Sequence, residues 1–113
     1  MSERLPKLLL EDILDSANKI IIYTEGLSYE DFCEDSKTID AVIRNFEIIG
    51  EATNRLPDDL KDNNPEVDWH KIRGLRNRIA HGYFGISFKV IWDIKEESLP
   101  LYKAQVESLL QQF

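Results

Sequence analysis

Apolar residues recur at helical spacing along most of the chain, and this spacing constrains the fold more than any other feature. No segment of any length alternates apolar and polar residues as a half-buried strand does. The clearest helical segment runs from Asp35 or Ser36 to Leu56, where one face repeats every three or four residues. This face comprises Ile39, Val42 or Ile43, Phe46, Ile49, Thr53 and Leu56. The sequence therefore predicts an all-α fold.

Turn-forming residues mark the ends of the first predicted helices. Pro6 suits the first turn of a helix, and Gly26 suits the turn after its end. Ser28 is a suitable cap for a short turn that carries Tyr29 and Phe32 toward the core. The apolar face of the first helix comprises Leu9, Ile13, Ala17, Ile20 and Thr24.

Proline, glycine and capping residues divide the second half of the chain in the same way. Pro57 ends the long second helix, because the residue before a proline avoids helical geometry, and residues 57–67 predict a loop. Asp68 suits the cap of a helix with an apolar side, which ends near Gly82 or Gly85. The apolar side consists of Trp69, Ile72, Leu75 and Ile79.

Two further helices are predicted toward the C-terminus. Ser87 suits the cap of a helix with Val90, Ile91 and Ile94, and Pro100 breaks the pattern and starts a last helix. The apolar residues of the last helix are Leu101, Val106, Leu109 and Leu110. Helices joined by short connections predict an antiparallel bundle of four to five helices.

Length and composition indicate one globular domain, residues 1–113, of which 42% are hydrophobic and 31% charged. No apolar run approaches the roughly 20 residues that a membrane span needs. Neither a secretory signal nor a membrane association is expected. The single Cys33 fits a reducing compartment, so we expect a cytoplasmic protein.

Basic residues are concentrated in one short segment of an acidic chain. The formal net charge is −7, yet the segment from His70 to His81 contains four cationic side chains and no acidic one. The four are Lys71, Arg73, Arg76 and Arg78. This distribution predicts a confined anion site rather than a long nucleic-acid groove. The alternative is a solvated helix face that other helices neutralise.

Residues 76–83 combine side chains suited to phosphodiester chemistry. Arg76 carries a planar, permanently charged group that binds phosphate, and His81 can exchange protons near neutral pH. They predict metal-independent RNA cleavage, in which a ribose 2′-hydroxyl attacks the adjacent phosphorus. His81 would act as base or acid, Arg76 would stabilise the developing charge, and Asn77 would orient the histidine or the phosphate. In the structural alternative, His81 bonds a backbone carbonyl and Tyr83 packs in the core or at its rim.

The spacing of Arg76 and His81 bears on how many chains form the site. Five residues correspond to about 140° around an ideal helix, so the two side chains of one chain diverge. Either the helix loosens near Ala80, or two copies of the segment converge across a dimer. We favour the dimer, because a two-fold axis supplies a second histidine for acid–base chemistry.

The second helix carries a further group of charged residues, namely Arg44, Glu47, Glu51 and Arg55. Glu47 and Glu51 are four residues apart, but no Glu-x-x-His pair accompanies them, so we expect no metal site. Glu51 and Arg55 have the favourable orientation for a helical ion pair. We interpret the group as solvated pairs or as partners of the cationic segment.

These residues carry a resemblance to a known family. The spacing of Arg76 and His81 resembles that of the HEPN superfamily (higher eukaryotes and prokaryotes nucleotide-binding), whose motif is Arg, four to six residues, then His. The extension to Tyr83 is similar to the HepT toxin branch, whose motif is Arg-x4-His-x-Tyr. Residues 44–52 and 74–77 also look like segments of that branch. The resemblance extends over essentially the whole chain.

The resemblance implies a homodimeric all-α bundle with Arg76 and His81 of both chains around one cleft. It implies a metal-independent endoribonuclease, without a cofactor, that acts as the toxin of a toxin–antitoxin pair. Asn77, Arg73 and Arg78 would support phosphate binding. The implied partner is a minimal nucleotidyltransferase antitoxin, which silences the toxin by transferring AMP to Tyr83. The alternative function is a non-catalytic helical subunit that helps a nucleotidyltransferase hold its nucleotide or substrate.

Overall fold

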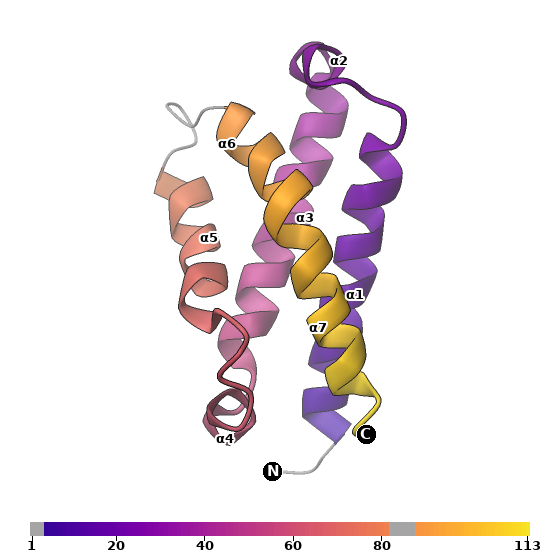
Figure 1. Cartoon of the computed structure of the whole chain (residues 1–113). Coiled ribbons are helices and arrows are strands. Elements are labelled where there is room, and N and C mark those ends of the chain that lie inside the picture. The colour runs from indigo at the N-terminus through magenta and orange to yellow at the C-terminus, as the bar shows by residue number, and fades with distance from the viewer. Residues whose placement is uncertain (1–3, 82–87) are drawn as a thin grey trace.

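The computed structural model describes residues 4–81 and 88–113, and every regular element within these ranges is helical (Figure 1). For Arg4 and for residues 76–81 it describes the backbone only. The elements are α1 (Arg4–Thr24), α2 (Tyr29–Glu34), α3 (Ser36–Arg55), α4 (Asp58–Asp62), α5 (Trp69–His81), α6 (Phe88–Asp93), the π-helical turn η1 (Ile94–Ser98) and α7 (Leu99–Leu110). The predicted all-α fold is confirmed.

The long helices run up and down beside one another (Figure 1). α1 packs against α3 and α7, and α3 also packs against α5. The short helices α2 and α6 lie at one end of the bundle, whereas α4 and the last residues of the chain lie toward the other end. This is the predicted antiparallel bundle, and it directs the C-terminal end of α5 toward the end of the molecule that carries α2 and α6 (Figure 1).

The predicted apolar faces of α1 and α3 form most of the core. Leu9, Ile13, Ala17 and Ile20 of the predicted α1 face are buried, and so is every residue of the predicted α3 face. Leu10, which was not predicted, is also fully buried. Burying each large aliphatic side chain contributes about 1.5–3 kcal/mol. Thr24 can occupy a buried position because its hydroxyl donates to the Ile20 carbonyl at 2.8 Å.

Capping interactions fix the ends of these helices at the predicted residues. Gly26 has a φ of +78°, the left-handed conformation that glycine adopts without steric cost. Ser28 and Asp31 form a reciprocal capping box at the start of α2. Asp35 accepts the Thr38 backbone N–H at 3.1 Å at the start of α3.

One short helix falls where the sequence predicted a loop. Within residues 57–67, the segment Asp58–Asp62 forms α4. Pro57 precedes it in extended geometry, and Asp58 and Asp59 occupy its first turn, where the positive end of the helix dipole favours acidic side chains. The prediction was wrong because these residues start a helix as readily as they populate a loop, and α4 is too short to show an apolar period.

Pro100 starts the last helix as predicted, but no break in the helical structure precedes it. Instead, α6, η1 and α7 follow one another without a loop, and Pro100 lies in the first turn of α7. Within η1 the Leu99 N–H donates to the Ile94 carbonyl five residues earlier. Proline lacks an N–H, and its ring clashes with the carbonyl four residues back in an α-helix, so the wider turn accommodates it.

Near this π-helical turn, the residues of α7 that face the core differ from the predicted ones. Val106 and Leu109 are buried as predicted, but Leu101 is 63% exposed. Leu99 and Tyr102 take the buried positions in this turn. The position of Ser87, the predicted cap of α6, lies outside the described residues. No helix in the described part of the chain has the length and apolar character needed to cross a bilayer.

Candidate functional site

Four of the predicted site residues lie on the last two turns of α5, and Arg73 lies one turn earlier on the same helix. Asp68 caps this helix by accepting the Lys71 backbone N–H at 3.0 Å, as predicted. Ile72 and Leu75 are buried and anchor the helix, which packs mainly against α3. Arg76, Asn77, Arg78 and His81 follow on the same helix, and their side chains lie outside the described part of the structure. Tyr83 lies outside the described residues altogether.

The backbone of α5 bears on the choice left open by the spacing. The helix remains α-helical through His81, with no loosening at Ala80. Arg76 and His81 of one chain are therefore about 140° apart around the helix axis, as in an ideal helix. The α-helical backbone therefore does not supply the loosening near Ala80 that was one of the two alternatives.

A polar and aromatic network holds the N-terminal half of α5 against α3 and α7. The hydroxyls of Thr53 and Tyr102 are 2.7 Å apart and both are buried. The edge of the Trp69 ring meets Tyr102 at a centroid distance of 6.2 Å, and the Trp69 indole N–H donates to the Asn64 carbonyl at 3.0 Å. Burial raises the pKa of Tyr102 above the usual tyrosine range, although its bond with Thr53 acts in the opposite direction.

Cationic side chains extend from α5 onto α4. Arg73, a predicted phosphate-binding residue, is exposed, and so is Lys71. Burial, followed by the positive charge of Arg73, lowers the pKa of Lys61 on α4. The Lys61 ammonium also donates to the Asn54 carbonyl at 3.5 Å. Within the described residues no acidic side chain forms an ion pair with Lys71 or Arg73, so both charges are available to an anion.

The charged group on α3 is less organised than expected. Arg44, Glu51 and Arg55 are exposed, and Glu47 is half-buried. The expected ion pair between Glu51 and Arg55 is not formed in the described structure. Both side chains are solvated, and an exposed pair of this kind contributes only about 0–1 kcal/mol. The described residues also contain no cluster of histidine, cysteine and acidic side chains that could hold a metal ion.

A comparison with protein families identifies the chain. Residues 13–109 match the family described as Ribonuclease HepT-like. The chain belongs to this family. The matched range includes Arg76, His81 and Tyr83, so the resemblance of the motif extends to the whole HepT-like domain.

Two relatives support this assignment along nearly their full lengths. "Putative RNase MJ1380" from Methanocaldococcus jannaschii is 42% identical over 107 residues, which cover 95% of this chain and 98% of the relative. "Probable ribonuclease HepT" from Thermococcus cleftensis is 40% identical over 100 residues, which cover 88% of this chain and 91% of the relative. No solved structure gives a significant match to the chain.

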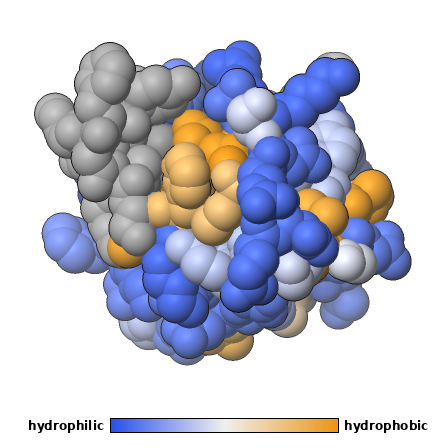
Figure 2. All heavy atoms as spheres, turned by 90° about the horizontal axis from the view of Figure 1, so that it is seen from above, coloured by the Kyte–Doolittle hydropathy of each residue, from blue (hydrophilic) through white to orange (hydrophobic). Residues whose placement is uncertain are grey.

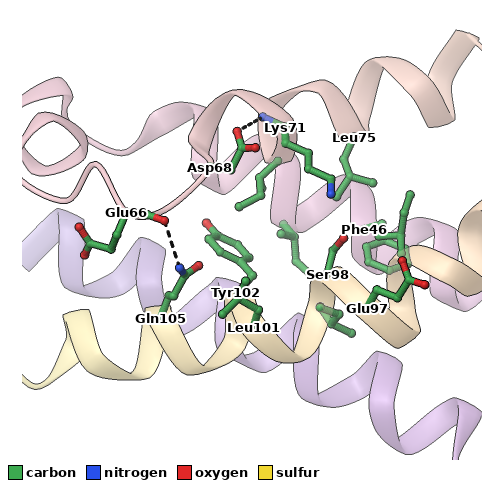
Figure 3. Close-up of a pocket in the computed structure, with 14 residues that line it drawn as sticks. Phe46, Glu66, Asp68, Lys71, Leu75, Glu97, Ser98, Leu101, Tyr102 and Gln105 are labelled. Atoms are coloured by element: carbon green, nitrogen blue, oxygen red, sulfur yellow. Dashed lines mark hydrogen bonds between the residues drawn. The ribbon is translucent and has the colours of Figure 1, made fainter.

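This HepT-like chain also has a cavity that the sequence did not predict. It measures about 280 Å³ and lies among α3, α5, η1 and α7, along the N-terminal half of α5 (Figure 3). Phe46, Ile72 and Leu75 contribute to its apolar wall, and Lys71 and Glu97 lie at its edge. The cavity joins residues far apart in the chain, so no local motif could indicate it. Among the described side chains, its α5 residues are Lys71, Ile72 and Leu75.

Proposed function

We propose that this HepT-like chain is a metal-independent endoribonuclease and the toxin of a toxin–antitoxin pair. The support is the family, the ribonuclease names of the relatives and the motif residues at the end of α5. The observation that carries the mechanism is the uninterrupted helix through His81. Since Arg76 and His81 of one chain diverge, we place the active site between two copies, with both arginines and both histidines around one cleft.

A surface feature is compatible with this homodimer. An apolar area is visible between hydrophilic residues at the end of the bundle that carries α2 and α6 (Figure 2). Phe88, the first residue of α6, is 40% exposed. Contiguous apolar surface often marks a protein interface. α5 is directed toward this same end of the molecule, so a contact made there would bring two copies of His81 near one another (Figure 1).

The proposed reaction needs only protein side chains and the RNA itself. One His81 removes the proton of a ribose 2′-hydroxyl, and the oxygen forms a bond to the adjacent phosphorus. The bond from phosphorus to the 5′-oxygen breaks, and the second His81 gives that oxygen a proton. The products are a 2′,3′-cyclic phosphate and a free 5′-hydroxyl. The two copies of Arg76 stabilise the charge that develops on the phosphate oxygens.

The remaining motif residues support and regulate this reaction. Asn77, Arg73 and Arg78 contact the neighbouring phosphates of the bound RNA. Tyr83 is the target of a minimal nucleotidyltransferase: its hydroxyl oxygen attacks the α-phosphorus of ATP, forms a bond to AMP and releases pyrophosphate. The added group brings bulk and negative charge next to the catalytic histidine, and both exclude RNA. The partner therefore acts as the antitoxin.

The test combines mass spectrometry with RNA digestion. The chain is co-expressed with the nucleotidyltransferase encoded beside it, and a Tyr83→Phe variant serves as the control. We expect the intact mass to rise by whole AMP units in the original chain and not in the variant. Only the unmodified chain should cleave RNA, leaving 2′,3′-cyclic phosphate ends. An unchanged mass together with intact RNA would instead support a non-catalytic subunit of a nucleotidyltransferase.

A further inference from the structure

The cavity beside α5 continues into a second hollow along α7. The second hollow measures about 290 Å³ and lies between α7 and the segment that precedes α5, with Asn64, Ser108 and Gln112 in its wall. Both hollows share Glu66 and Gln105, which are joined by a bond of 3.4 Å from the Gln105 amide to the Glu66 carbonyl (Figure 3). Together they form one groove along α7, here called the α7 groove.

The dimensions of the α7 groove match a helix rather than a small molecule. Its α7 side extends from Leu99 to Leu109, which corresponds to about 15 Å, or roughly three helical turns. Each hollow exceeds the roughly 150 Å³ that accommodates a benzene ring, but neither reaches the range of about 300–1,000 Å³ typical of sites that enclose a ligand. Two side-chain-sized hollows along a groove are typical of sites that bind an amphipathic helix.

The floor of the first hollow is apolar, and an exposed apolar residue also lies at its edge. Phe46, Ile49 and Leu99 are buried beneath it. Leu101 stands at the edge with 63% of its surface exposed, the largest exposed fraction among the large apolar side chains of the described residues. An exposed leucine next to an apolar hollow is suited to contact a complementary apolar side chain.

The charges at the edge of the groove select the partner. Among the described residues, Glu66, Asp68 and Glu97 line the first hollow together with the basic Lys71, which gives these four side chains a net charge of −2 (Figure 3). Glu97 forms no ion pair with the described residues. A basic segment is complementary to this edge, whereas RNA phosphates are repelled.

We infer that the α7 groove binds a basic amphipathic helix of a different protein. An apolar side chain of that helix enters the first hollow, and a polar side chain two turns further along lies in the second hollow, which is lined mostly by polar residues. This spacing follows because Leu101 and Ser108 are about 10 Å apart along α7. Lysine or arginine residues beside these anchors pair with Glu97 and Glu66. The π-helical turn contributes Ile94, Glu97 and Ser98 to the groove, and such turns occur frequently at functional sites. This binding does not depend on the proposed ribonuclease reaction.

The probe is a pair of synthetic helical peptides of about 16 residues, enough to span the groove. Both carry a leucine anchor and, two turns further along, a glutamine anchor. One peptide has lysines beside the anchors and the other has glutamates. Amide chemical shifts of the whole chain are followed by NMR, and affinities by calorimetry. We expect the lysine peptide to shift amides between residues 64–75 and 97–112. The glutamate peptide should bind at least tenfold more weakly.

Two variants and one matched control locate the contact. Leu101→Ser and Glu97→Lys should each weaken the lysine peptide about tenfold or more, a change of about 1.4 kcal/mol. Leu8→Ser removes an apolar side chain of α1 that is 45% exposed and lines neither hollow, and it should leave affinity unchanged. RNA cleavage should be the same in Leu101→Ser as in the original chain, so peptide binding and the nuclease reaction are tested separately.

Three outcomes would overturn the inference. The first is equal binding of the two peptides, or shifts that avoid the groove. The second is an RNA oligonucleotide that shifts the same amides, which would assign the groove to nucleic acid. The third is a change from dimer to monomer in sedimentation on Leu101→Ser, which would mean that a second copy covers the groove.

Discussion

Arg76 and His81 are the residues on which the proposed reaction depends most directly. A general acid or base contributes about 10²–10⁴-fold, and a donor to developing charge about 10²–10³-fold. We expect Arg76→Ala and His81→Ala each to reduce the rate of RNA cleavage by at least 10²-fold, with unchanged helical content by circular dichroism. His70, which is exposed at the other end of α5, offers a matched control. If His70→Ala were as damaging as His81→Ala, the effect would belong to the helix rather than to the motif.

The buried hydroxyl of Tyr102 predicts a pH dependence of stability. Burial raises its pKa above the usual value of about 10, so the folded state holds the phenolic proton more tightly than the unfolded state. The stabilisation that the protonated Tyr102 gives to the folded state is therefore fully present below about pH 10. It is lost as the pH rises above that value. In the Tyr102→Phe variant, the free energy of unfolding should fall less above pH 10 than it does in the original chain. Urea denaturation from pH 8 to 11 measures this difference.

The same substitution has an effect at neutral pH. Tyr102→Phe leaves the buried Thr53 hydroxyl without its cross-helix partner, at a cost of about 1–3 kcal/mol. The double variant Tyr102→Phe with Thr53→Val should lose less unfolding free energy than the sum of the two single losses. The reason is that each hydroxyl is the hydrogen-bond partner of the other. Additive losses would mean that the bond contributes nothing to stability.

At the scale of elements, α5 contains a glycine that the fold of this chain does not require. A Cβ built on Gly74 meets nothing within 4 Å in the described structure. Glycine within a helix costs about 0.5–1 kcal/mol relative to alanine. Gly74→Ala should therefore raise the free energy of unfolding by that amount. Gly26→Ala is the contrasting variant: it also has open space, but its φ is +78°, so it should be destabilising.

The helices differ in how far the sequence could predict them. α1 and α3 were predictable because they combine long apolar faces with capping residues at both ends, as Gly26 and Asp35 illustrate. α4 has no apolar period, and the continuation of the chain through η1 depends on how a π-helical turn accommodates Pro100. Local patterns therefore predict helices with long buried faces, but not short helices or changes in helical hydrogen bonding.

The candidate site was predictable to a similar extent. The motif from Arg76 to His81 is contiguous, so its place on one helix followed from spacing alone. The contact between Thr53 and Tyr102 joins residues 49 positions apart, and the proximity of Lys61 to Arg73 depends on α4. The α7 groove depends on four elements at once. Such features arise from tertiary packing, which the local sequence does not encode.

At the scale of the whole molecule, the proposed function depends on two copies sharing one cleft. This arrangement makes a prediction for a mixed dimer of one original chain and one His81→Ala chain, purified through two different affinity tags. If each chain had its own complete site, the mixed dimer would keep half of the activity. If both histidines act in one reaction, one as base and one as acid, a single substitution removes an essential proton transfer. We expect less than about a tenth of the original cleavage rate, consistent with the 10²–10⁴-fold effect of acid–base catalysis.

The matched control is a mixed dimer that carries His70→Ala in one chain, which should keep full activity. Sedimentation of each mixture establishes that the dimer persists. Half activity in the His81→Ala mixture would contradict the shared cleft and favour an independent site in each chain. That result would require the side chains of Arg76 and His81 to bridge the 140° between them within one copy. The mixed dimer therefore tests the inference drawn from the helical geometry of α5 without requiring the RNA target to be known.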